Sequence, residues 1–140
     1  MIEVVNRQRK VPIKAERWRT FSENALRTIR KDDQDATIAF VSDRQIRNLN
    51  KRFRKIDKPT DVLSFPAGEA MATSPATNLG DIAISLERAE VQAQENNLTF
   101  DAELAQLILH GLLHLCGYDH ETDNGQMNRL ELQLRRRLKI

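Results

Sequence analysis

Residues 104–116 form an almost uninterrupted apolar run with only three polar side chains, two of which are His110 and His114. A segment of this length that is hydrophobic on nearly every side is typical of a helix buried inside a domain. Thr99 is expected to cap its beginning, and Gly117 suits the left-handed position that ends a helix. The rest of the chain must therefore pack around this helix.

The chain has three histidines, His110, His114 and His120, and all of them lie in or just after this apolar run. Side chains at positions i and i+4 of a helix lie about 5–6 Å apart at their Cβ atoms. Two such imidazoles can share a metal ion, and a third ligand from the following loop would leave one tetrahedral position open for water. Core histidines that bond to nearby carbonyls are the simpler alternative, but the spacing of all three favours a catalytic metal site.

The histidine spacing also matches that of the metzincin proteases, H-E-x-x-H-x-x-G-x-x-H, including the glycine at Gly117. In those enzymes the glutamate after the first histidine is the general base that activates the metal-bound water. This chain has Gly111 at that position. A zinc-dependent peptidase or amidase therefore stays an alternative that lacks its expected base.

The segment from His110 to His120 resembles the signature H-G-x-L-H-L-x-G-Y-D-H of the YbeY family, the metal-dependent endoribonucleases of bacterial ribosomal RNA maturation. Two further stretches are similar to the family in the same order, residues 49–66 and residues 79–85. One departure is Phe53, where the family often has tyrosine. The resemblance covers about residues 36–123, and it implies a mixed sheet packed on helices.

This resemblance implies a single-strand-specific endoribonuclease that acts in rRNA maturation, including the 16S rRNA 3′ end, and in ribosome quality control. It implies one zinc ion per chain on His110, His114 and His120, although imidazole also suits other divalent transition metals. The expected partners are single-stranded RNA or an rRNA precursor, and the ribosome or its small subunit. A non-catalytic ribosome assembly factor with a structural metal remains an alternative.

Arg54 matches the family's catalytic arginine. A guanidinium suits this role because it stays charged and donates two parallel hydrogen bonds to a phosphate group. Composition alone does not separate Arg54 from Arg52 or Lys55.

The identity of a general base stays open. Three aspartates could orient a histidine ligand through its second ring nitrogen, although each could equally be a cap, turn or surface carboxylate: Asp61, Asp81 and Asp119.

The charges are segregated along the chain although the net charge is only +2. Residues 1–31 hold nine Lys and Arg against three acids, residues 43–58 hold seven against two, and residues 60–105 hold one against eight. Basic clusters attract phosphate backbones, although each cluster could also be a solvated helix face. Together with a metal site they favour a nucleic-acid substrate.

A single cysteine excludes an internal disulfide and favours a reducing compartment. No apolar run approaches the roughly 20 residues that cross a bilayer, and the first residues do not resemble a signal peptide. We therefore expect a cytoplasmic protein without membrane contact.

Hydrophobic periodicity predicts one domain, residues 1–140, with about four strands and about five helices in an α+β or α/β arrangement. Since the resemblance implies a mixed sheet packed on helices, we expect the α+β class. The predicted metal site lies on one helix and the loop that follows it. Residues 66–78 are expected to form a mobile loop. The predicted strands are 2–5, 37–41, 61–65 and 79–85, and the predicted helices are 14–31, 42–53, 86–96, about 100–116 and 123–137.

Overall fold

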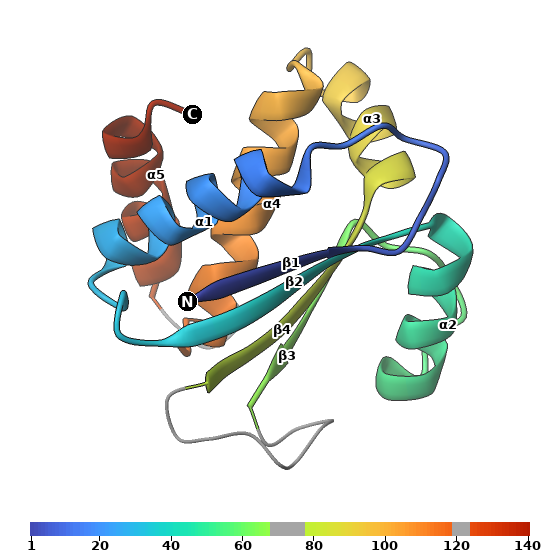
Figure 1. The fold of residues 1–140 in the computed structure, drawn as a ribbon, viewed down its shortest axis with the longest axis horizontal. Helices are drawn as coiled ribbons and strands as arrows, with labels where there is room; N and C mark the ends of the chain where they lie inside the picture. Colours follow the sequence, from blue (N-terminus) through green and yellow to red (C-terminus); the bar gives the residue numbers. More distant parts are fainter. Residues whose placement is uncertain (68–77, 119–123) are drawn as a thin grey trace.

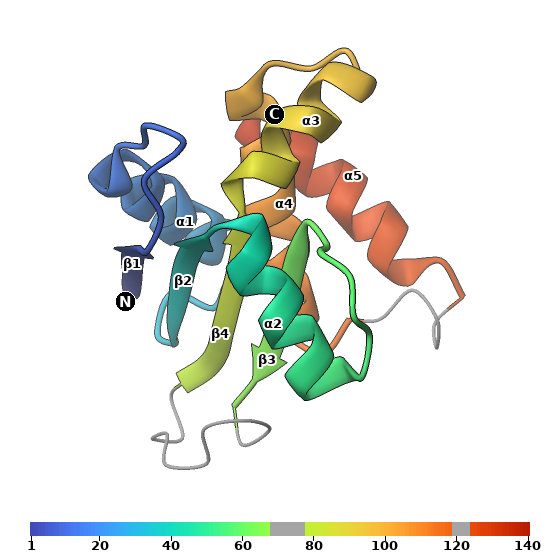
Figure 2. The same cartoon turned by 90° about the vertical axis from the view of Figure 1, so that its right-hand side faces the viewer.

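The computed structural model describes residues 1–67, 78–118 and 124–140. In these residues, strands and helices follow one another in a mixed order (Figures 1 and 2). The elements are β1 (Ile2–Asn6), α1 (Ala15–Ile29), β2 (Asp35–Val41), α2 (Asp43–Arg54), β3 (Val62–Pro66), β4 (Asn78–Ser85), α3 (Leu86–Glu95), α4 (Phe100–Leu115) and α5 (Gln126–Leu138).

The four strands form one mixed sheet in the order β1-β2-β4-β3. β1 and β4 both pair in parallel with β2, whereas β3 pairs antiparallel with β4 and forms an edge. The predicted α+β class, with about four strands and five helices, is confirmed. The order of the strands and the antiparallel edge were not predicted.

Both faces of the sheet are covered because alternate residues of its strands point to opposite sides. In β2, Ile38 and Phe40 are fully buried in the core shared with α1, α3 and α4. Ala39 and Val41 point to the other face, where they pack with Ile46 of α2. Figures 1 and 2 show α2 separated by the sheet from the other helices.

Helix α4 is the central helix of this fold, as its composition predicts. Leu104, Ile108 and Leu112 are fully buried against the sheet side of the core. On another side, Leu109 and Leu113 pack against α5. The helix is therefore enclosed along most of its length.

The predicted helix ends are confirmed. The Thr99 side chain accepts a hydrogen bond from the backbone of Ala102 and so caps α4. Gly117 follows the helix with a left-handed φ of 97°. At α2, Ser42 and Gln45 form both hydrogen bonds of a capping box. These contacts fix the bounds of the two helices that carry the candidate site residues.

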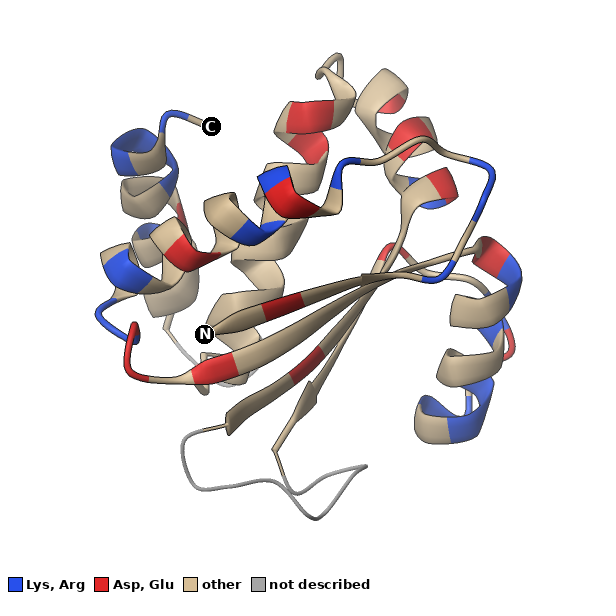
Figure 3. Ribbon diagram, viewed as in Figure 1, with Lys and Arg blue, Asp and Glu red and all other residues tan. Residues whose placement is uncertain are grey.

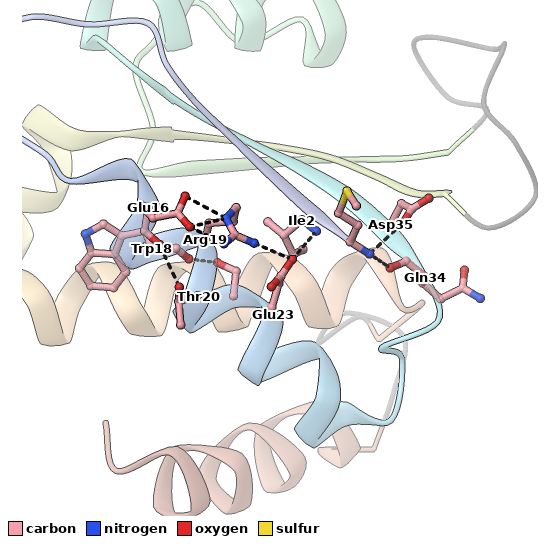
Figure 4. Close-up of polar contacts among 10 residues, drawn as sticks. Ile2, Glu16, Trp18, Arg19, Thr20, Glu23, Gln34 and Asp35 are labelled. Atoms are coloured by element: carbon pink, nitrogen blue, oxygen red, sulfur yellow. Dashed lines mark hydrogen bonds and ion pairs between the residues drawn. The ribbon is translucent and has the colours of Figure 1, made fainter.

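Basic side chains gather on the helices at two sides of the molecule, along α2 and along α5 (Figure 3). Two basic residues of α1 pair instead with acids, Arg17 with Asp101 and Arg19 with two glutamates. Arg19 pairs with both Glu16 and Glu23, and Glu23 also accepts a hydrogen bond from the backbone of Ile2 in β1 (Figure 4). The amino terminus is fixed in the same way, by ion pairing with Asp35. This part of the first basic cluster is therefore structural.

Two predictions fall partly outside the described residues. The expected loop over 66–78 includes residues 68–77, and the expected last helix begins at residue 123, whereas α5 begins at Gln126. No helix in the described parts of the chain is long and apolar enough to cross a membrane.

Candidate active site

A cavity of about 450 Å³ lies where the end of α4 meets the edge strand β3. Arg54 reaches it from the last residue of α2, and His110 and His114 reach it from α4. The structure therefore brings together three of the four residues singled out from the sequence. The cavity is also lined by Val62, Leu63, Ser64, Pro66, Gly117 and Tyr118.

The two imidazoles face each other in this cavity. Their Nε2 atoms lie 3.0 Å apart, with the rings nearly perpendicular at 79°. Two nitrogen ligands of a tetrahedral metal ion would lie about 3.4 Å apart, given metal–nitrogen bonds of about 2.0–2.1 Å. Only a slight opening separates the observed pair from that geometry. The donor set and its spacing thus fit a shared metal ion.

Glu131 of α5 fixes the orientation of the His110 ring. Its carboxylate lies 3.2 Å from Nδ1 of His110, and its side chain is only 7% exposed. Arg135 lies 3.5 Å from the same carboxylate oxygen and forms an ion pair with it. An ionised carboxylate only accepts hydrogen bonds, so Nδ1 of His110 donates to it and Nε2 keeps its lone pair. That lone pair faces His114.

Sequence reasoning missed Glu131, although a signal was present. Met127, Leu130 and Leu134 give α5 its apolar face, and Glu131 falls on the same face. A carboxylate in that position must be partnered when the face is buried.

Arg54 is held at the rim of the cavity by its own contacts. Its Nη2 donates to the Ser64 carbonyl oxygen of β3 at 2.8 Å. Its guanidinium also lies 5.1 Å from the centre of the Phe65 ring, and Phe65 packs edge-on against Phe53. The αL conformation of Lys55 ends α2 directly after Arg54. Together these contacts keep a positive charge near the histidines.

Residues 3–139 match the family model described as Endoribonuclease YbeY. The chain belongs to the YbeY family. A curated member from Nautilia profundicola is 47% identical over 77% of this chain and 75% of its own length. One from Koribacter versatilis is 50% identical over 74% of this chain and 64% of its own length. Each of these proteins is named Endoribonuclease YbeY.

The relatives differ in length. The match covers 35% of the YbeY protein of Myxococcus xanthus, which is 48% identical, so the chain spans about a third to three quarters of the relatives it matches. A solution structure of a Thermotoga maritima protein is similar to this fold, with a TM-score of 0.66 and 30% identity over 99% of this chain and 89% of that one. The fold is therefore shared with a solved structure.

The family assignment leaves the two alternative functions without support, since the relatives are named neither as peptidases nor as assembly factors. The position of Gly111 agrees with this. A Cβ atom there would lie 3.0 Å from Cδ1 of Ile82 in β4, so this position faces the sheet and not the cavity. A glutamate at 111 would be driven into the apolar core, where an unpaired carboxylate is costly.

Two of the three aspartates considered from the sequence lie elsewhere. Asp61 accepts hydrogen bonds from the Thr60 hydroxyl and the Val62 backbone, as a turn residue does. Asp81 lines a separate cavity on the α2 face of the sheet, where burial raises the pKa of its carboxyl. Neither the hydrogen bonds of Asp61 nor the cavity lined by Asp81 involves a described histidine. Asp119 lies outside the described residues.

The third histidine of the YbeY signature, His120, also lies outside the described residues. Among residues 1–67, 78–118 and 124–140, no group of three or more metal-binding side chains is assembled. Cys116 follows α4 and is half-buried, and burial raises the pKa of its thiol. A neutral thiol is a poor metal ligand. The described part of the predicted site is thus the pair His110 and His114.

The Glu131 contact gives a prediction for metal affinity. Glu131→Gln removes the charge that stabilises the Nδ1–H form of His110 but keeps an oxygen that can accept its hydrogen bond. We expect metal affinity to fall about tenfold, at the lower end of the roughly 10- to 100-fold effects seen for such partners. Competition with a chromophoric zinc chelator measures this. Glu90→Gln, which removes an exposed charge on α3, is the matched control, and equal affinities in both variants would contradict the role of Glu131.

Proposed function

We propose that this chain is a metal-dependent endoribonuclease that cleaves single-stranded RNA in the maturation of rRNA, including the 16S rRNA 3′ end, and in ribosome quality control. The ribosome or its small subunit is the proposed setting of that activity. The observation that carries this proposal is the convergence of the Nε2 atoms of His110 and His114 with the guanidinium of Arg54 in one cavity.

The proposed metal ligands are His110, His114 and His120, with zinc as the proposed ion. The first two are supported by their geometry, and His120 by its place in the family signature. Binding of one ion through both Nε2 atoms would require each imidazole to carry its proton on Nδ1. When bound, the ion supplies Lewis acidity next to the scissile phosphate and an open coordination position.

The proposed role of Arg54 is to bind the phosphate group during cleavage. Negative charge grows on the non-bridging oxygens as the phosphodiester reacts, and a guanidinium fixed beside them stabilises it without reorganisation. Contacts with the Ser64 carbonyl and the Phe65 ring hold the Arg54 guanidinium at the cavity. Because Arg54, His110 and His114 line one cavity, the proposed binding site of the phosphate lies between the arginine and the histidines.

A side chain at position 111 would face Ile82 of β4 and not the cavity. We therefore propose that cleavage does not depend on a glutamate base at the metzincin position. Single-stranded RNA is the favoured substrate because an unpaired backbone can bend into a cleft that excludes an A-form duplex.

The direct test compares two polymers with one protein sample. We expect the zinc-loaded protein to cleave an unstructured RNA and to leave casein intact, and we expect a chelator to abolish RNA cleavage until zinc is restored. Gel analysis of labelled RNA and of casein measures both activities. Intact RNA beside degraded casein would overturn the proposal in favour of a peptidase. RNA cleavage that continues in the presence of the chelator would show that the activity does not depend on a metal ion.

A further inference from the structure

The candidate active site adjoins two open cavities, one between α5 and the end of α1 and the other along α5. They have volumes of about 510 and 560 Å³. Tyr118 lines both of them and also lines the cavity of the histidines. The three hollows therefore meet at one aromatic side chain. We call the two outer cavities the α5 surface, whose basic members are Arg30, Arg129, Arg136 and Arg137.

The charge of the α5 surface is of one sign among its described residues. Four arginines and no acid line the two cavities, and Figure 3 shows the basic residues of α5 and of the α1 end in blue on the same side of the molecule. Within the described parts of the chain, none of these four arginines forms an ion pair. Among the described residues, no acid pairs with these four charges.

Other arginines of the chain behave differently. Arg17 pairs with Asp101, Arg47 pairs with Asp57, and Arg135 turns to Glu131 beneath the histidines. The contrast within α5 is informative, because Arg135 and Arg136 are adjacent in sequence but only Arg136 lines the outer cavities. One helix thus supports the active site on one face and presents positive charge on another.

Tyr118 is fixed in place by the way α4 ends. The Gly117 N–H donates to the His114 carbonyl at 3.0 Å, and the Tyr118 N–H donates to the Leu113 carbonyl at 3.2 Å. These are the two bonds of a Schellman motif, which requires the left-handed φ found at Gly117. The tyrosine is 37% exposed. The turn that ends the histidine helix therefore sets an accessible aromatic ring between the histidines and the α5 surface.

We propose that the α5 surface binds the single-stranded RNA segment next to the scissile phosphate, with Tyr118 stacking on a base and the four arginines contacting phosphates. This inference rests on the proposed function, since it extends the substrate from the same site. Aromatic stacking beside a basic groove is the usual way in which proteins bind single-stranded nucleic acid without reading its sequence. Arg129 and Arg136 are seven residues apart on α5, about 10 Å along the helix, so they contact different phosphates.

The test measures binding separately from cleavage. A fluorescent, fully 2′-O-methylated oligonucleotide of unstructured sequence serves as the probe, and its affinity is determined by anisotropy at several salt concentrations. For a single strand, each phosphate contact contributes about 0.7 to the slope of log affinity against log salt. We expect the Arg129→Ala/Arg136→Ala double variant to bind roughly tenfold more weakly at 0.1 M salt and to lose about 1.4 from this slope.

The matched control is the Arg9→Ala/Arg44→Ala double variant, which removes the same charge from exposed positions outside these cavities. We expect its affinity and slope to equal those of the parent protein. An equal loss of affinity in both double variants would show that binding depends on net charge and not on the α5 surface, and it would overturn the proposal. Unchanged binding in the Arg129/Arg136 variant would overturn it directly.

The Tyr118 ring is tested by two substitutions. Tyr118→Phe keeps the stacking surface and is expected to bind the probe like the parent protein, whereas Tyr118→Ala is expected to bind about tenfold more weakly. Equal binding by both variants would show that the Tyr118 ring does not stack on the bound RNA.

Cleavage of the corresponding unmodified RNA separates this proposal from the proposed function. We expect the Arg129/Arg136 variant to show a raised KM with kcat retained. If the parent protein cleaves RNA and the variants bind and cleave it equally well, the proposed RNA binding by the α5 surface is wrong, whereas the proposed endoribonuclease activity is supported. If the variants lose binding but the parent protein cleaves no RNA, the proposed endoribonuclease activity is wrong, whereas the α5 surface is supported as an RNA-binding site.

Discussion

His114→Ala is expected to lose the bound metal and RNA cleavage together while the protein stays folded. Alanine favours the helical conformation, and His114 is only partly buried, so the substitution removes the ligand without opening a large hole in the core. The remaining ligands bind zinc weakly because a tetrahedral catalytic site needs three of them. The loss of several kcal/mol of charge stabilisation corresponds to a fall in cleavage rate on the order of 10³-fold.

Metal content, cleavage rate and circular dichroism are measured on the same preparation of the His114→Ala variant. Gln106→Ala is the matched control, since Gln106 lies on the same helix, is also partly buried and does not line the cavity. We expect that control to keep one equivalent of metal and full activity. A full equivalent of zinc on the His114→Ala protein would exclude this histidine as a ligand, whatever happened to the rate.

The elements of the fold could be predicted because their signals are local. The capping box at Ser42, the cap at Thr99 and the glycine after α4 each act within a few residues, and they set helix bounds to within one or two residues. The apolar run of α4 required burial whatever surrounded it.

The order of the strands could not be predicted, because it depends on contacts between distant residues. β4 inserts between β2 and β3, and the antiparallel pairing of β3 brings Phe65 opposite Asp81. Short apolar strands with similar composition carry no local signal for that choice. The same limit explains the misplaced aspartates, since whether Asp81 faces the histidines or the α2 side depends on which face of β4 is covered by which helix.

The candidate site was predictable in its metal-binding half and less so in its surroundings. The spacing of His110 and His114 is a helical pattern with a chemical meaning, whereas Arg54 was one of several basic residues in α2 until the family signature separated it. Glu131 lies on a helix that was predicted from the sequence, but the sequence did not indicate which side of that helix faces α4. Its contact with His110 joins residues 21 positions apart and is visible only in the folded chain.

Arg54→Ala is expected to abolish most RNA cleavage while the protein retains its fold and metal. The guanidinium lines the same cavity as the histidines but is not a metal ligand, so zinc content should equal that of the parent protein. Removing one preorganised donor to a developing negative charge reduces rates by about 10²- to 10³-fold. The lost contact with the Phe65 ring should lower the free energy of unfolding by only about 1 kcal/mol.

Two further arginine variants make the Arg54 result specific. Arg54→Lys keeps the charge but cannot donate the planar pair of hydrogen bonds, so its rate should lie between those of the alanine variant and the parent protein. Arg52→Ala removes an equal charge from the same helix. The Arg52 side chain lies over Phe53 and lines the cavity on the α2 face of the sheet, not that of the histidines. The cleavage rate of Arg52→Ala should stay near that of the parent protein. If Arg52→Ala and Arg54→Ala reduced cleavage equally, α2 would act through its overall charge, and no single guanidinium would bind the reacting phosphate.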